Sequence, residues 1–145
     1  MTTVAYALGR ICIPIVFIVA GLHKLLNVGQ VASDLAAARI PVPDEITTYL
    51  GGMPKYQAVG YLVGAIEVIC GLMVLLGFKA RWGAVALIVF TVAATFFFHN
   101  FWDMTGDAYL KNQVHALKNL AILGGLLLVV AGGSRGTSWD GRPTA

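Results

Sequence analysis

Charged residues are scarce in this chain. Only 12% of its 145 residues are Asp, Glu, Lys or Arg, while 58% are hydrophobic, and a soluble domain carries about 25% charged residues. This shortage excludes an ordinary water-soluble domain. The net charge of +3 comes from scattered residues, and without a basic run no nucleic-acid partner is predicted.

Cysteine is also rare. Cys12 and Cys70 stand 58 residues apart inside apolar runs, so the sequence has neither a C-x-x-C pair nor a Cys/His zinc spacing. We expect two buried thiols that behave as small hydrophobic side chains. A disulfide or redox pair is the alternative, and no metal site is predicted.

The features of a cleaved signal peptide are missing from the N-terminus. Arg10 lies too far along the chain to belong to a positively charged leader, and the apolar run around it is too long for the hydrophobic region of such a peptide. We therefore expect the first apolar segment to remain as a membrane helix.

Long apolar stretches are what the sequence does contain. Each is close to the ~20 residues that cross a ~30 Å hydrocarbon core, and they span about 4–26, 57–78, 81–101 and 113–132. They are too long for strands and lack period-two alternation, and a chain of 145 residues cannot bury four such helices away from water. The sequence predicts an all-α integral membrane four-helix bundle in the lipid bilayer, with one domain over the whole chain.

The connecting segments predict the topology. Apolar residues at helical spacing before Pro41 indicate a short interfacial helix in the loop at about 27–56, and aromatic residues mark the loop at about 102–112 as a membrane interface. Lys and Arg divide equally between the two sides, so we give most weight to Lys79 and Arg81 in the shortest loop. The termini and this hairpin are predicted to face the cytoplasm.

Glu67 is the most informative polar residue because it lies near the middle of the second predicted helix. A carboxylate at that depth must pair with a cation or take up a proton. Arg10, Lys24 and Lys118 are the available cations, and depth favours Lys118. Glycines at positions 60, 64 and 71 share the helix face of Glu67 and would allow a neighbouring helix to approach closely.

Other polar side chains reach one common level near the outer ends of the remaining helices. We predict them as ligand-binding residues, and they are Lys24, His99, His115, Lys118 and Asn119. Glu67 is predicted to relay protons for the same site, inside the bundle. In the alternative reading the lysines extend to the headgroups and each histidine is an ordinary hydrogen-bonded interfacial residue.

Several short motifs together resemble the DoxX family of small bacterial inner-membrane proteins. They are Gly-Leu-His-Lys-Leu at 21–25, Leu-Leu-Gly-Phe-Lys-Ala-Arg at 75–81, His-Asn-Phe-Trp-Asp-Met-Thr-Gly-Asp at 99–107, Lys-Asn-Leu at 118–120 and Ser-Trp-Asp at 138–140. The resemblance implies a four-helix fold in the inner (plasma) membrane. It also implies a link, in some members, to quinone-coupled oxidoreductases and to thiol or oxidative stress.

Four functions follow from these observations. The first is a redox-linked subunit that binds a quinone near its outer face, and the second is a non-enzymatic anchor or assembly partner for a redox protein. The third is a small-molecule or proton transporter built around Glu67, and the fourth is b-haem ligation by two of His23, His99 and His115. Whether the chain is an enzyme, and whether it forms oligomers, stays open at this point.

Overall fold

The computed structural model describes residues 2–133. This part of the chain is helical, with no strand, and its elements are α1 (Thr2–Leu26), α2 (Val28–Ala37), α3 (Glu45–Tyr49), α4 (Lys55–Leu76), α5 (Ala80–Phe98), a 3₁₀ turn η1 (Phe101–Asp103) and α6 (Gly106–Gly132). Four of the helices are long and apolar enough to cross a membrane, which confirms the predicted all-α membrane fold. The Ser-Trp-Asp motif at 138–140 lies outside the described residues.

The structure corrects the predicted boundaries at the start of the last helix. α6 begins at Gly106, so most of the segment at about 102–112 is helical where a loop was expected. An apolar run marks the part of a helix inside the hydrocarbon, but the helix itself continues into the polar interface, where Asp107 stabilises its first turn. The interfacial helix α2 ends before Pro41 as predicted, whereas the short α3 was not predicted.

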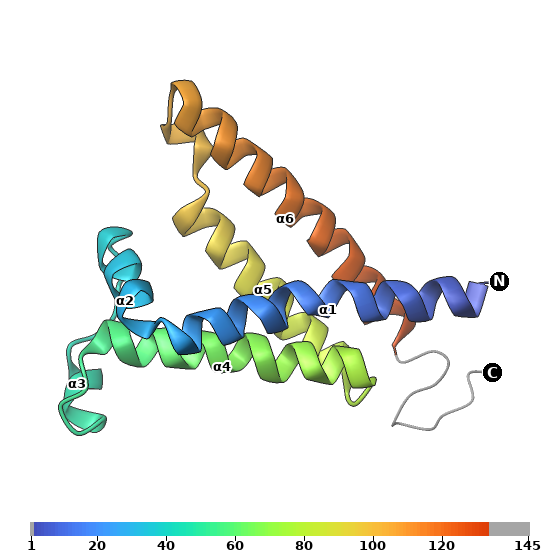
Figure 1. The fold of residues 1–145 in the computed structure, drawn as a ribbon, viewed down its shortest axis with the longest axis horizontal. Helices are drawn as coiled ribbons and strands as arrows, with labels where there is room; N and C mark the ends of the chain where they lie inside the picture. The colour runs from blue at the N-terminus through green and yellow to red at the C-terminus, as the bar shows by residue number, and fades with distance from the viewer. Residues whose placement is uncertain (1, 134–145) are drawn as a thin grey trace.

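The four long helices alternate in direction and define two ends of the molecule. The N-terminal part of α1, the turn between α4 and α5, and the C-terminal part of α6 meet at one end, called here the hairpin end (Figure 1). α2, α3 and η1 lie at the opposite end, the loop end. The tight turn depends on Gly77, whose φ of 73° is strained for other residues.

Glycines let α1 and α4 pack closely along their length. A Cβ atom added at Gly21 would lie only 2.7 Å from the carbonyl oxygen of Gly64, and one added at Gly71 would lie 2.7 Å from the side chain of Ile18. The two backbones therefore approach more closely than larger side chains would allow. This contact brings Glu67, on the same face of α4, against α1.

The apolar core lies nearer the hairpin end. It consists of buried side chains from all four long helices: Phe17, Val74, Ala80, Ala84, Leu87, Leu126 and Val129. Toward the loop end, the pair formed by α5 and α6 diverges from the pair formed by α1 and α4, as Figure 1 shows. The predicted polar residues lie toward the loop end, outside the apolar core.

Hydrogen bonds tie the helix ends together at the hairpin end. The Tyr6 hydroxyl donates to the Gly133 carbonyl oxygen at 2.5 Å. The buried Arg10 guanidinium donates to the carbonyl oxygens of Val74 and Leu75, at 3.2 and 3.3 Å. Because those carbonyls lie in the last turn of α4, Arg10 stabilises a helix C-terminus and is not the partner of Glu67.

Candidate functional site

Glu67 and Lys24 form a buried ion pair between α4 and α1. Glu67 is 2% exposed, and its Oε2 lies 2.7 Å from Lys24 Nζ, whose side chain is 26% exposed. Helical side chains lean toward the N-terminus of their own helix. Since α1 and α4 run in opposite directions, Lys24 leans inward from the loop end while Glu67 leans outward from the middle of the membrane, and their charged groups meet.

The expectation that depth favours Lys118 as the partner of Glu67 was wrong. Lys118 Nζ lies 3.2 Å from His115 Nδ1 on the same helix. Depth fixes how far along a helix a side chain lies, but the angular position of each helix decides what that side chain faces. The close packing of α1 on α4 at Gly21 places Lys24 beside Glu67 instead.

An aromatic side chain of α5 also contacts the ion pair. Lys24 Nζ lies 5.6 Å from the centroid of the Phe90 ring, which is a cation–π distance. Phe90 in turn meets Phe17 edge to face, with centroids 6.4 Å apart. The ammonium of Lys24 is therefore held between an acidic group on α4 and an aromatic face on α5.

The predicted polar residues of α5 and α6 meet each other as a second cluster. The rings of His99 and His115 stack with centroids 4.8 Å apart and planes 15° from parallel. Nδ1 of His99 lies 3.0 Å from Asn112 Oδ1, and the Asn119 amide donates to Thr95 Oγ1 at 2.9 Å. Side chains from both helices are thus joined over about two turns of α6 and one turn of α5.

The exposed members of this cluster lie on the face of α6 that turns toward α1. Positions seven residues apart share nearly the same helix face, and Lys118, Gly125 and Gly132 recur at that spacing. A Cβ atom at Gly125 or Gly132 would contact α1 side chains. Lys118 extends this α1-facing stripe into the diverging half, and both it and His115 are exposed.

The polar residues of the predicted site fall into two groups, which we call the two polar walls. Lys24 and Glu67 form the wall on α1 and α4, and Lys24 faces α5 through its contact with Phe90. His115 and Lys118 form the wall on α6. The residues were predicted to form one connected site. In the structure Lys24 contacts Glu67, and Lys118 contacts His115, so each wall is connected within itself.

Two contact residues, Phe90 and Asn112, were missed by the sequence reasoning. Phe90 gave no signal because it is one more apolar residue in an apolar stretch. Asn112 fell in the predicted loop at about 102–112. If α6 had been extended to its true start, Asn112 would have been found on the face of His115 and Asn119, three and seven residues away.

The histidine geometry bears on haem ligation. Two axial histidines lie on opposite sides of a porphyrin, whose thickness separates their rings. His99 and His115 stack directly on each other, which leaves no room for a macrocycle between them. His23 is exposed on α1. Within residues 2–133, no three His, Cys, Asp or Glu side chains are placed to hold a metal ion together.

The cysteines differ in part from the expectation. Both are free thiols, so they form no disulfide. Cys70 is half-buried, but Cys12 is exposed on the surface of α1, which makes the prediction of two buried thiols wrong for Cys12. In a membrane helix an apolar position can face lipid as well as the core, so apolar sequence alone does not imply burial.

Comparison with known proteins gives two matches. The DoxX family model matches residues 5–100, which contain nearly all of α1 and all of α2 to α5. The inner membrane protein YphA of Escherichia coli (strain K12) is 30% identical over 135 residues, covering 93% of this chain and 87% of the relative. No solved structure gives a significant match.

Proposed function

This chain belongs to the DoxX family of multi-pass inner-membrane proteins, and from that premise we propose that it is a redox-linked membrane subunit that binds a quinone. The proposal depends chiefly on one observation. Two walls of hydrogen-bond donors, Lys24 on α1 and His115 with Lys118 on α6, lie in the diverging half of an otherwise apolar bundle. Polar and charged donors within membrane helices are costly unless they serve a ligand or each other.

The chemistry of these side chains fits a quinone headgroup. A quinone presents two carbonyl oxygens, which accept hydrogen bonds and cannot donate them. The ammonium groups of Lys24 and Lys118 are donors without acceptor capacity, and a histidine ring can donate as well. The ring of Phe90, beside Lys24, supplies an aromatic surface for a flat ligand. The surrounding apolar helices suit an isoprenoid tail.

Glu67 is proposed as the proton relay of this site. When bound, a quinone supplies coupled electron and proton chemistry, so a group able to hold a proton must lie nearby. Glu67 Oε2 is buried and lies 2.7 Å from Lys24 Nζ, so a proton on one group can pass to the other over a hydrogen-bond distance. A partner redox protein at the membrane surface would exchange the electrons with the bound quinone.

Quinone titration of the purified protein tests the proposal. We expect decylubiquinone or menadione to quench tryptophan fluorescence saturably. Lys118→Met should weaken binding about tenfold, since a hydrogen bond to a charged group contributes roughly 1.5–3 kcal/mol. Lys118 is the better variant because it is exposed and its removal leaves no buried charge. Lys79→Met, at the hairpin end, is the matched control and should bind as the wild type does.

Absence of saturable binding by a folded wild-type protein would contradict the proposal. Equal weakening by Lys118→Met and Lys79→Met would contradict the assigned site. If the wild type shows no saturable binding, a role as a non-enzymatic anchor or assembly partner becomes the better explanation, since it needs no ligand in the polar walls.

A further inference from the structure

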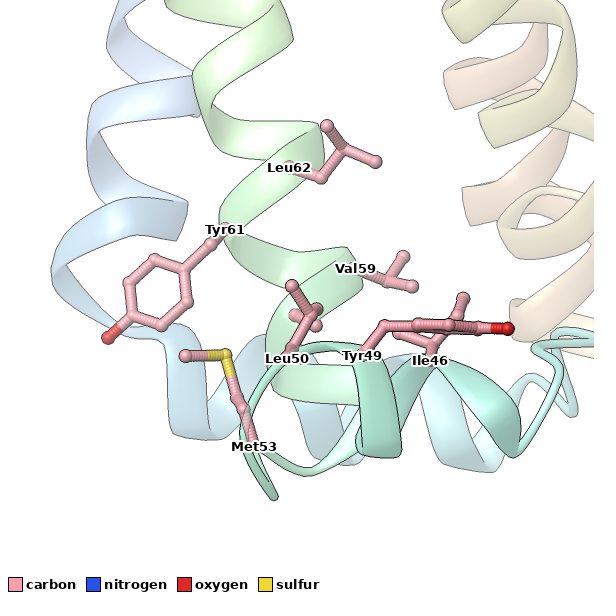
Figure 2. A pocket seen from close by; sticks show the side chains of 8 residues that line it. Ile46, Tyr49, Leu50, Met53, Val59, Tyr61 and Leu62 are labelled. Carbon is pink, nitrogen blue, oxygen red and sulfur yellow. The ribbon is translucent and has the colours of Figure 1, made fainter.

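A separate apolar hollow of about 590 Å³ lies at the loop end, between α3 and the first turns of α4. Figure 2 shows Tyr49 and Val59 at one end of it and Met53 and Tyr61 at the other. The full lining is Ile46, Tyr49, Leu50, Met53, Ala58, Val59, Tyr61 and Leu62. None of these residues belongs to the two polar walls. The volume is within the range of roughly 300–1,000 Å³ that holds small molecules.

The hollow lies where the membrane surface is expected. The candidate membrane span of α4 begins at Lys55. The part of α4 that lines the hollow lies in the first two turns after that residue. Tyr49 is 84% exposed, which suits a side chain in the interfacial region, where tyrosine is enriched. A lipid chain reaching up to the interface would cover this apolar surface.

An ion pair marks the water side of the hollow. Lys55 shares one face of α4 with Ala58, Val59 and Leu62, because these positions follow the i, i+3, i+4, i+7 spacing. Lys55 Nζ lies 2.5 Å from Asp44 Oδ1. The Asp44 side chain is 90% exposed and that of Lys55 is 27% exposed, so both charges are accessible from the headgroup region.

We propose that this hollow is a binding site for one zwitterionic phospholipid whose headgroup ends in a primary ammonium, such as phosphatidylethanolamine. One acyl chain occupies the hollow, the phosphate pairs with Lys55, and the ammonium pairs with Asp44. The adjacent opposite charges match the opposite charges of such a headgroup. A purely anionic lipid satisfies Lys55 but repels Asp44, and a quaternary ammonium cannot donate a hydrogen bond to the carboxylate. The site is independent of the proposed quinone function.

Native mass spectrometry of the full chain tests this site. The protein is reconstituted in nanodiscs with equal amounts of phosphatidylethanolamine, phosphatidylcholine and phosphatidylglycerol, and then released into a mild detergent. We expect one retained lipid, with phosphatidylethanolamine enriched about three- to fivefold over the other two, as expected for an exposed ion pair. Asp44→Asn should bring phosphatidylethanolamine and phosphatidylcholine to equal retention.

A second variant tests the hollow without touching the charges. Leu62 is 59% exposed, so Leu62→Trp can fill the hollow with little effect on the helix packing, and it should abolish the retained lipid. Ile69→Trp is the matched control on the same helix, with 58% exposure away from the hollow, and should keep the lipid. Circular dichroism checks that each variant is helical. Equal retention of the three lipids by the wild type, or an adduct that survives Leu62→Trp, would overturn the proposal.

Discussion

Replacing Lys24 with methionine should destabilise this protein more than replacing Glu67 with glutamine. Lys24→Met leaves a carboxylate that is 2% exposed without its ammonium partner, near the middle of a membrane helix. Glu67→Gln leaves an ammonium whose side chain is 26% exposed and lies close to the loop end of α1. That ammonium can turn toward the interface, as long cationic side chains near helix ends do, whereas the carboxylate has no such route.

The loss in free energy of unfolding depends on the group that each variant leaves without its partner. Removing one member of a buried ion pair costs about 3–5 kcal/mol, and we expect Lys24→Met near the lower limit because Lys24 is partly solvated. Glu67→Gln loses a charged hydrogen bond and keeps an amide in the same place, so its cost should be about 1.5 kcal/mol. The predicted difference between the two variants is therefore roughly 1.5 kcal/mol.

Reversible unfolding in mixed detergent and SDS micelles, followed by far-ultraviolet circular dichroism, gives the free energies. The double variant Lys24→Met with Glu67→Met is the informative partner, because an apolar pair of similar size often matches a buried ion pair in stability. It should recover most of the loss caused by Lys24→Met alone. Lys118→Met, on the exposed face of α6, serves as control and should change stability by less than about 0.5 kcal/mol.

Two results would refute this reasoning. If Glu67→Gln lowered the free energy of unfolding more than Lys24→Met, the unpaired ammonium would be more destabilising than the unpaired carboxylate. A double variant as unstable as Lys24→Met would mean that the loss comes from packing and not from an unpaired charge.

Other predictions concern packing, topology and the thiols. Gly21→Ala should cost about 1–3 kcal/mol, because its new Cβ atom would lie 2.7 Å from a backbone oxygen of α4, whereas Gly124→Ala, with nothing within 4 Å, should cost little in the same unfolding assay. Alkaline phosphatase fused after Arg135 should be inactive and fused near Asp44 active, and the reverse pattern would place the termini outside. A double serine variant of the two free cysteines should keep quinone binding unchanged, and loss of binding at normal abundance would give the thiols a role.

The sequence by itself determined the spans and the general class of fold. Bilayer thickness sets the length of an apolar stretch, so four such stretches indicate four crossing helices with no knowledge of how they pack. The depth of Glu67 followed from the same counting, and its burial against a cation could be predicted because lipid does not tolerate a lone carboxylate. The sequence also predicted that His99 and His115 lie at the same depth in the membrane, and their rings stack in the structure.

Tertiary structure decided which groups meet. Lys24, not Lys118, pairs with Glu67 because glycines at 21, 64 and 71 let α1 lie against α4. Helix counting gives depth along the membrane normal but not the rotation of each helix or the choice of neighbour, since every helix in lipid is apolar on most of its faces. The hollow beside α3 was hidden for the same reason, because it exists only where a short helix folds back against the start of α4.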